Sequence, residues 1–149
     1  MPDGYSPFAC GSGSNGAFAP RLSTASVRPL SDVLYSFGGS PDAEHPCAGL
    51  LAGKKGEYYG TSVDGGSHGQ GAVYEITAAG KEKVLYSFKG AADGAHPYST
   101  LIADKEGALY GDTLDGGTGS GHGTAFKLTF GKHGWTESVL YSFQGELQG

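Results

Sequence analysis

Two Asp-Gly-Gly triplets supply the residues of this chain whose type and spacing could bind a metal ion. Asp64 and Asp115 each precede two glycines in a stretch rich in Gly, Ser and His. A carboxylate and nearby backbone carbonyls could bind Ca²⁺, which takes oxygen ligands. Neither stretch supplies the further carboxylates of an EF-hand-like loop. We therefore expect each aspartate to cap its own backbone in a turn. Asp64 and Asp115 are kept as calcium candidates, and no other metal or cofactor is predicted.

The histidines recur in the same way. His45 and His96 stand before proline in equivalent turns, and His68 and His122 fall in the Asp-Gly-Gly loops. Zinc sites need three or four ligands within reach, and the sequence has no His-x₃-His or Cys/His cluster. We expect His45 and His96 to be hydrogen-bonded turn residues that lie one repeat apart and not in one site. His68 and His122 are expected to face solvent and are candidates for ligand binding.

Aromatic side chains could stack on a sugar ring if they were exposed. Trp135 is the single tryptophan and lies in a stretch, 131–138, that has no counterpart earlier in the chain. We expect a loop there, in which Trp135 either contacts a ligand or folds back on its own repeat. The tyrosines recur at strand positions, so we expect them to pack between repeats, where each aromatic ring can bury roughly 150–250 Å².

No catalytic residue is predicted. A serine nucleophile would need a strained Gly-x-Ser-x-Gly elbow between a strand and a helix, and the Gly-Ser stretches at 11–14 and 119–121 lack those flanks. A residue that occurs once per repeat fits an architectural role better than a catalytic one, because an active site needs several different groups that converge. We expect a protein that is not an enzyme. A hydrolase or lyase on a propeller scaffold is the alternative.

The composition restricts the fold class. Glycine makes up 28 of the 149 residues, 17% of the residues are charged, and the formal net charge is −5. Interior glycines disfavour long helices, and an acidic chain lacks the basic face of a nucleic-acid binder. No run of 18 apolar residues is present, so no membrane-spanning helix is predicted. These features favour a glycine-rich, all-β protein.

The first eight residues and the two cysteines bear on the compartment. Residues 1–8 have neither the basic nor the apolar segment of a secretory signal peptide. Taken literally, the chain would remain in the cytoplasm; taken as a piece of a longer protein, it gives no information on location. Cys10 and Cys47 form no Cys-x-x-Cys pair. We expect both to be free thiols, with a single disulfide as the alternative.

A tandem repeat organises the rest of the chain. Val-Leu-Tyr-Ser-Phe occurs three times, and the second and third copies begin 51 and 55 residues after the one before. Aligning residues 33–66 with 84–117 needs no gap, and 18 of the 34 positions are identical. Residues 1–30 are expected to be disordered or a degenerate remnant of a repeat. The tandem region, 31–149, divides into repeat one (33–83), repeat two (84–138) and the start of repeat three (139–149).

Each repeat predicts four short strands separated by turn residues. The predicted strands are 48–52, 57–63, 71–77 and 84–88, followed by 99–103, 108–114, 123–129 and 139–143. Four strands in about 50 residues are typical of a propeller blade. We therefore predict an all-β, β-propeller-like fold of about two four-stranded antiparallel blades, with Val33–Phe37 as an orphan last strand. Because propellers have 4–8 blades, we expect an incomplete propeller that self-associates or packs with missing blades.

The repeated motif resembles a known family. The pattern Val-Leu-Tyr-Ser-Phe, Asp-Gly-x-x-Pro, Gly-x-Leu-Tyr-Gly-x-Thr and Gly-x-Gly-Thr-x-Phe-Lys-Leu is similar to the GloVer tandem repeat of Gloeobacter and Verrucomicrobia, a kelch-like β-propeller repeat. Residues 84–129 are the best copy, with His96 where the family more often has Asn. In the first copy, Ala43 replaces the turn glycine and Tyr58 replaces the leucine. The resemblance implies a secreted or surface-anchored bacterial repeat protein with no established enzymatic activity.

Together these patterns predict a non-enzymatic β-repeat module that acts in binding or structural packing, as a fragment or short member of such a family. The alternative is a glycan-binding, lectin-like propeller, for which exposed Tyr side chains or Trp135 beside polar loops would be required. A carbohydrate or protein ligand is expected, with no nucleic-acid partner.

Overall fold

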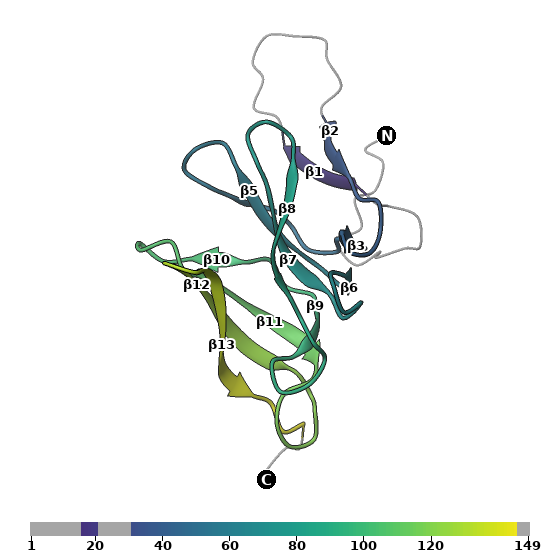
Figure 1. Ribbon diagram of the computed structural model, residues 1–149, viewed down its shortest axis with the longest axis vertical. Helices are drawn as coiled ribbons and strands as arrows, with labels where there is room; N and C mark the ends of the chain where they lie inside the picture. Colours follow the sequence, from purple (N-terminus) through teal and green to yellow (C-terminus); the bar gives the residue numbers. More distant parts are fainter. Residues whose placement is uncertain (1–15, 21–30, 146–149) are drawn as a thin grey trace.

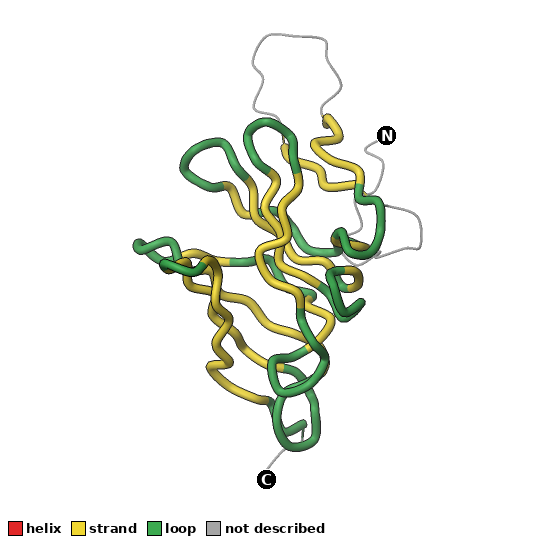
Figure 2. The backbone as a smooth tube through the Cα atoms, in the orientation of Figure 1, coloured by secondary structure: helices red, strands yellow, loops and turns green. Residues whose placement is uncertain are grey.

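The computed structural model describes residues 16–20 and 31–145 (Figure 1). These residues form thirteen strands and no helix (Figure 2), and every strand pair is antiparallel. Glycine-rich turns separate short strands of alternating burial, which explains the absence of helices from this part of the chain. The fold is therefore all-β, as predicted, and none of its sheets closes into a barrel. It is compatible with an incomplete propeller-like fold.

Two larger sheets correspond to the two predicted blades. Sheet one has the strand order β4-β5-β7-β8 and sheet two has the order β10-β11-β12-β13. Within each sheet the strands occur in chain order, as in a meander, although β6 lies between β5 and β7 in the chain. The bounds are Leu51–Ala52, Tyr58–Ser62, Ala72–Ile76 and Glu82–Ser87 for β4, β5, β7 and β8, and Ile102–Ala103, Leu109–Asp115, Thr124–Gly131 and Gly134–Ser142 for β10 to β13.

Three further short strands lie beside the Asp-Gly-Gly loops. Strand β3 (Ala43–Glu44) pairs with β6 (Asp64–Gly65), and β9 (Ala95–Pro97) pairs with the end of β11. The sequence predicts only turns in these segments. Their pairing brings each His-Pro turn against the Asp-Gly-Gly loop of the same repeat.

A leading hairpin precedes sheet one. Strand β1 (Gly16–Pro20) pairs with β2 (Ser31–Ser36), which contains most of the predicted orphan strand. The register has a shift just before Phe18, which lies opposite Val33, and the same shift occurs in the β7–β8 and β12–β13 pairs. The leading hairpin therefore matches the third and fourth strands of a repeat. Pro20 ends β1 in a two-stranded sheet, where a proline is tolerated.

The hairpin β12–β13 differs from the prediction. Trp135 was expected in a loop over 131–138, but it lies on β13 opposite Phe130, and only two residues connect Gly131 with Gly134. The extra residues of repeat two lengthen both strands because they include aromatic and β-branched side chains, which favour strands. Gly134 has φ +100°, which permits the tight turn.

The hydrophobic core lies between consecutive sheets. One cluster joins the leading hairpin to sheet one through Phe37 and Tyr74, whose ring centroids are 4.9 Å apart. The second joins sheet one to sheet two through Phe88 and Phe126, at 5.1 Å. The leading hairpin and the two sheets follow one another along the long axis of the molecule (Figure 1). Each sheet thus covers the last strand of the element before it.

The Tyr-Gly pair inside the second strand of each sheet has a packing role. A Cβ on Gly60 would approach the ring of Tyr74 within 2.6 Å, and a Cβ on Gly111 would approach that of Phe126 within 2.7 Å. Both values are shorter than carbon contacts in packed proteins. Glycine at these positions therefore allows the aromatic ring of the third strand to lie directly against the second strand.

No described residue belongs to a helix long and apolar enough to cross a membrane.

Candidate functional site: polar contacts between the repeats

Each repeat pairs one histidine with one aspartate. Nδ1 of His45 lies 2.9 Å from Oδ2 of Asp64, and Nδ1 of His96 lies 2.9 Å from Oδ2 of Asp115. Both histidines have a left-handed backbone, with φ of 53° and 54°. This conformation is uncommon for residues other than glycine, and histidine is among the side chains that adopt it more often.

The Asp-Gly-Gly loop makes this pairing possible. Gly65 has φ +82°, and a Cβ there would clash with the backbone of Asp42 and Glu44. The glycines therefore allow the loop to approach the His-Pro turn closely. The expected cap is different: the aspartate side chain contacts a histidine of the turn instead of its own backbone.

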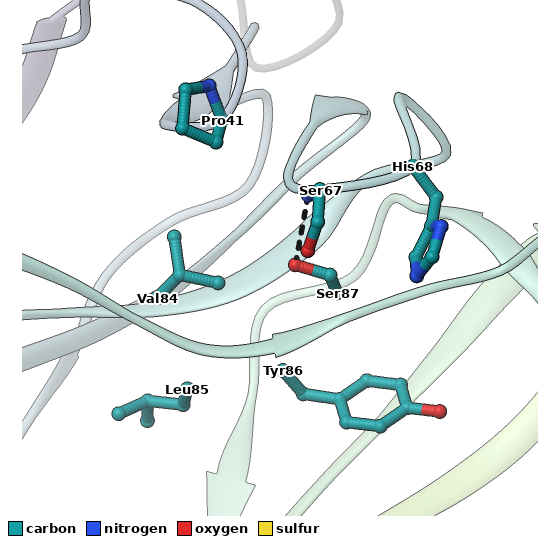
Figure 3. Close-up of a pocket in the computed structure, with 7 residues that line it drawn as sticks. All are labelled: Pro41, Ser67, His68, Val84, Leu85, Tyr86 and Ser87. Atoms are coloured by element: carbon teal, nitrogen blue, oxygen red, sulfur yellow. Dashed lines mark hydrogen bonds between the residues drawn. The ribbon is translucent and has the colours of Figure 1, made fainter.

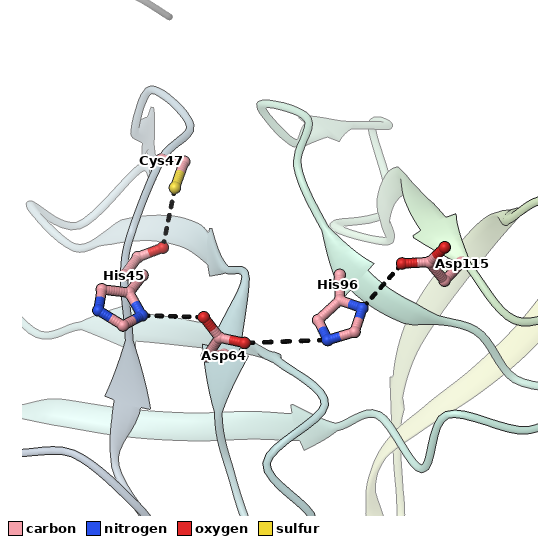
Figure 4. A network of polar contacts seen from close by, with 5 residues as sticks. All are labelled: His45, Cys47, Asp64, His96 and Asp115. Atoms are coloured by element: carbon pink, nitrogen blue, oxygen red, sulfur yellow. Dashed lines mark hydrogen bonds and ion pairs between the residues drawn. The ribbon is translucent and has the colours of Figure 1, made fainter. Parts of the chain in front are cut away.

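The two His–Asp pairs form one row (Figure 4). Nε2 of His96 lies 3.8 Å from Oδ1 of Asp64, so the row runs from His45 to Asp64, His96 and Asp115 across the boundary between repeats. We expected the two histidines to lie in separate sites. That expectation is wrong, because stacking the sheets brings the loop of one repeat to the turn of the next. A separation of 19 residues from His to Asp in both repeats is the signal that could have shown the pairing.

The row alternates histidine imidazoles with aspartate carboxylates. An imidazole has two N–H donors only when it is protonated, so a protonated His96 can donate to both of its aspartates. No group of three or more His, Cys, Asp and Glu suited to a metal ion occurs in the described part of the chain. Asp64 and Asp115 each face histidine, and their role as calcium ligands stays a prediction.

A second polar cluster occurs once at each boundary. The hydroxyl of Tyr35 donates to Oδ2 of Asp42 at 2.9 Å, and the hydroxyl of Tyr86 donates to Oδ2 of Asp93 at 2.7 Å. The tyrosine comes from the last strand of one sheet, and the aspartate lies seven residues later, in the turn before the next sheet. This Tyr–Asp bond therefore joins the last strand of one element to the turn that leads into the next sheet, and its repeated spacing was visible in the sequence.

A glutamate from the following sheet completes each cluster. Burial raises the pKa of Glu82 to about 8, helped by a hydrogen bond with Asp42 and by the charge of Asp42. Burial also raises the pKa of Glu137 to about 7, with a further contribution from the charge of Asp93. Oε1 of each glutamate is buried and has no hydrogen-bond partner.

The neighbours of Glu82 respond to the same environment. Burial and the bond to Asp42 raise the pKa of Tyr35 to about 12. Burial opposes ionisation of Asp42, but hydrogen bonds from the Gly38 amide, Glu82 and Tyr35 outweigh it and lower the pKa of the Asp42 carboxyl. Glu82 is therefore protonated near neutral pH and donates its proton toward an ionised Asp42.

An open pocket of about 460 Å³ lies beside β8 (Figure 3). His68, a predicted ligand-binding candidate, lines it together with the hydroxyl-bearing Ser67 and Ser87. The amide of Ser67 donates to Oγ of Ser87 at 3.1 Å. The remaining lining residues are Pro41, Val84, Leu85 and Tyr86.

The other two ligand-binding candidates lie elsewhere. His122 lies beside Gly145, and its backbone forms an isolated parallel β-bridge with Gly116. Trp135 is half-buried, and its ring centroid lies 6.5 Å from that of Tyr59, on sheet one. Trp135 therefore packs against the preceding sheet as well as against Phe130 of its own hairpin. A ligand role for the two residues stays a prediction.

Cys47 corrects a further expectation. We expected a free thiol, but Cys47 is disulfide-bonded. Its Sγ lies 3.2 Å from the carbonyl oxygen of His45, at one end of the His–Asp row. The absence of a Cys-x-x-Cys motif excludes only pairing between near neighbours in the chain, and folding can bring distant cysteines together. Cys10 lies outside the described residues.

The repeated contacts agree with the comparison to known families. The family model of the Gloeobacter/Verrucomicrobia repeat matches residues 10–149. The chain belongs to the Gloeobacter/Verrucomicrobia repeat family. The match extends over the leading hairpin as well as both sheets, so the Gloeobacter/Verrucomicrobia repeat accounts for every described strand. No curated protein has a sequence that matches this chain.

Proposed function

We propose that this member of the Gloeobacter/Verrucomicrobia repeat family is a non-enzymatic module whose propeller-like blades act in binding and structural packing. One observation carries the proposal: the same boundary is built twice, from the same repeated positions. Phe37 on Tyr74 and Phe88 on Phe126 are equivalent contacts. The Tyr–Asp bonds that accompany them are equivalent as well. Residues that occur once per repeat thus take part in stacking each sheet on the element before it.

Activity assays on the purified chain test the non-enzymatic proposal. Hydrolysis and elimination are measured on a panel of polysaccharides, with Glu82→Gln as the variant and the exposed Glu106→Gln as its control. The carboxyl pair of Asp42 and Glu82 has diverging pKa values, a pattern found in acid–base catalysis, so it is the pair to remove. We expect no turnover by any form. Turnover that Glu82→Gln abolishes and Glu106→Gln keeps would contradict the proposal.

Glycan binding is the second candidate, and the pocket beside β8 favours it. Its volume lies within the usual range for small-molecule sites, roughly 300–1,000 Å³. Two serine hydroxyls, an imidazole and an aromatic ring give it the mixed polar and apolar lining that sugars require. Sheet two repeats part of this arrangement, because the amide of Thr118 donates to Oγ of Ser142 at 3.2 Å. The loop of repeat two has Gly119 at the position that His68 occupies in repeat one.

A glycan array followed by calorimetry with the best ligand tests this second candidate. His68→Ala should weaken binding by about tenfold, the loss typical of one polar contact with a ligand. His133→Ala, in the exposed turn between β12 and β13, is the matched control and should leave binding unchanged. Equal binding by both variants would exclude the pocket as the glycan site.

The compartment is a further part of the proposal. The family resemblance implies a secreted or surface-anchored protein. A disulfide at Cys47 supports this location, because disulfides persist mainly in oxidising compartments.

A further inference from the structure

The last strand of each element is covered by the element that follows it. Leu34, Tyr35 and Phe37 of the leading hairpin pack in one cluster with Tyr74 and other residues of sheet one. The equivalent residues of sheet one pack in one cluster with sheet two; they are Leu85, Tyr86 and Phe88. Leu85 is 9% exposed and Phe88 is fully buried. The two boundaries therefore show what kind of surface this strand binds.

The same residues of sheet two are uncovered. Leu140 is 55% exposed, Tyr141 58% and Phe143 42%. Ile102 on β10 is 67% exposed, whereas its counterpart Leu51 on β4 is partly buried against sheet two. We call these four residues the open face. All four match residues of sheet one that pack in the cluster shared with sheet two, and exposed apolar surface of this kind marks an interaction site.

The leading hairpin contains the kind of strand that covers the preceding element at the internal boundaries. At both internal boundaries the covering residue comes from the third strand of a repeat: Tyr74 on β7 and Phe126 on β12. Strand β1 is the third strand of the leading hairpin, and Phe18 holds the same register, opposite a valine and directly after the shift. No further repeat precedes β1 among the described residues.

We propose that the open face binds the β1–β2 hairpin of a second copy of this chain, head to tail. The proposal rests on the packing role given under Proposed function and names its partner. At both internal boundaries the aromatic contact joins the residue after a fourth strand to a third strand, and a tail-to-tail dimer would lack this contact. Because the two surfaces differ, the contact is heterologous, and it extends until a ring closes or a filament forms.

Light scattering after size exclusion, over a range of concentrations, measures the association. The full chain should exceed its monomer mass of 15.2 kDa. Leu140→Glu should weaken association at least about tenfold, as expected when a charge enters an apolar contact. Phe130→Glu is the matched control: Phe130 is 65% exposed, but it lies at the hairpin tip beside Trp135 and outside the open face. The Phe130→Glu variant should associate as strongly as the unchanged chain.

Mixing two variants tests the head-to-tail arrangement. Phe18→Glu should block the leading hairpin and leave the open face intact, whereas Leu140→Glu does the reverse. Each variant alone should be monomeric, and an equimolar mixture should form a one-to-one dimer. Thermal melting of each variant confirms that it is folded.

Two results would overturn the inference: a folded monomer at all concentrations, or an oligomer that Phe18→Glu leaves unchanged. Neither would contradict the non-enzymatic packing module, because the contacts between the repeats within one chain would remain.

Discussion

Sheet one and sheet two contain the same last strand in different surroundings. In Val-Leu-Tyr-Ser-Phe at 84–88, where sheet two covers the strand, Leu85 and Phe88 are buried and the other three residues are partly buried. At 139–143, where no described residues cover the strand, every residue but Ser142 is exposed. Phe88 is fully buried, whereas Phe143 is 42% exposed. Identical residues thus contribute differently to stability, because burial depends on the neighbouring repeat and not on the motif itself.

The largest expected difference is between Phe88→Ala and Phe143→Ala. Removing a buried phenylalanine ring should lower the free energy of unfolding by about 3–5 kcal/mol. Removing the half-exposed ring should lower it by less than about 1 kcal/mol. Urea denaturation of dilute protein measures both. Equal losses would show that Phe143 is also covered in solution.

Gly111→Ala tests the close packing within sheet two. The new Cβ would meet the ring of Phe126, so the ring must shift, and we expect a loss of about 1–3 kcal/mol. Gly131→Ala is the control, since a Cβ there would meet no atom within 4 Å and its φ is not positive. Thermal melting should separate the two variants. Similar melting temperatures would contradict the close approach.

Tyr86→Phe and Tyr141→Phe remove the same hydroxyl of the repeated motif, first from the covered copy and then from the uncovered copy. Removing the hydroxyl of Tyr86 deprives Asp93 of its 2.7 Å hydrogen bond, so we expect a loss of about 1–2 kcal/mol. Tyr141 is 58% exposed, and its hydroxyl should contribute nothing measurable. Denaturant unfolding near neutral pH measures both. A loss for Tyr141→Phe equal to that for Tyr86→Phe would indicate a partner on the open face.

The raised pKa of Glu82 makes stability depend on pH. Its folded pKa of about 8 exceeds the ordinary 4.5, so the folded state holds a proton that the unfolded state has lost. Stability from this group is complete below pH 4.5 and is lost as the pH rises through 8. Solvent screening of a half-buried group limits the total to about 1–2 kcal/mol.

Glu82→Gln should flatten the pH dependence of the midpoint of denaturation in this window. Glu137 should likewise contribute stability that is lost as the pH rises through about 7, because burial raises its pKa only to about that value. Glu137→Gln should remove this loss of stability. Glu106→Gln, on the surface, is the control. If Glu82→Gln leaves the slope of the denaturation midpoint against pH unchanged, the raised pKa of Glu82 is contradicted.

The smallest effect concerns the His–Asp row. A double-mutant cycle of His96→Asn with Asp115→Asn should give a coupling of about 0.5–1 kcal/mol, as expected for an exposed pair at 2.9 Å. The cycle with Asp64→Asn should give less, because that distance is 3.8 Å. Asparagine keeps the left-handed backbone accessible. A stronger coupling to Asp64 would mean that His96 joins the repeats more than it orders its own loop.

Much of the local structure was predictable from the residues. The strand positions in both sheets, the positive φ of the Asp-Gly-Gly glycines and the close approach at Gly60 and Gly111 follow from turn chemistry and residue alternation. The position of Trp135 was not predicted, because the same aromatic residues can lie in a loop or lengthen a hairpin. Of the ligand-binding candidates, His68 lines the pocket beside β8.

The sequence by itself determined the all-β fold, the repeat and its family, because these depend on short-range patterns that recur along the chain. The tertiary structure alone decided which residues meet between repeats. The His–Asp row, the carboxyl pair of Asp42 and Glu82, and the contact of Trp135 with Tyr59 join residues that lie far apart in the chain. It also decided which copy of Val-Leu-Tyr-Ser-Phe is buried. The physical reason is that burial and charge coupling depend on distances in space, which stacking of the sheets sets and a linear motif does not contain.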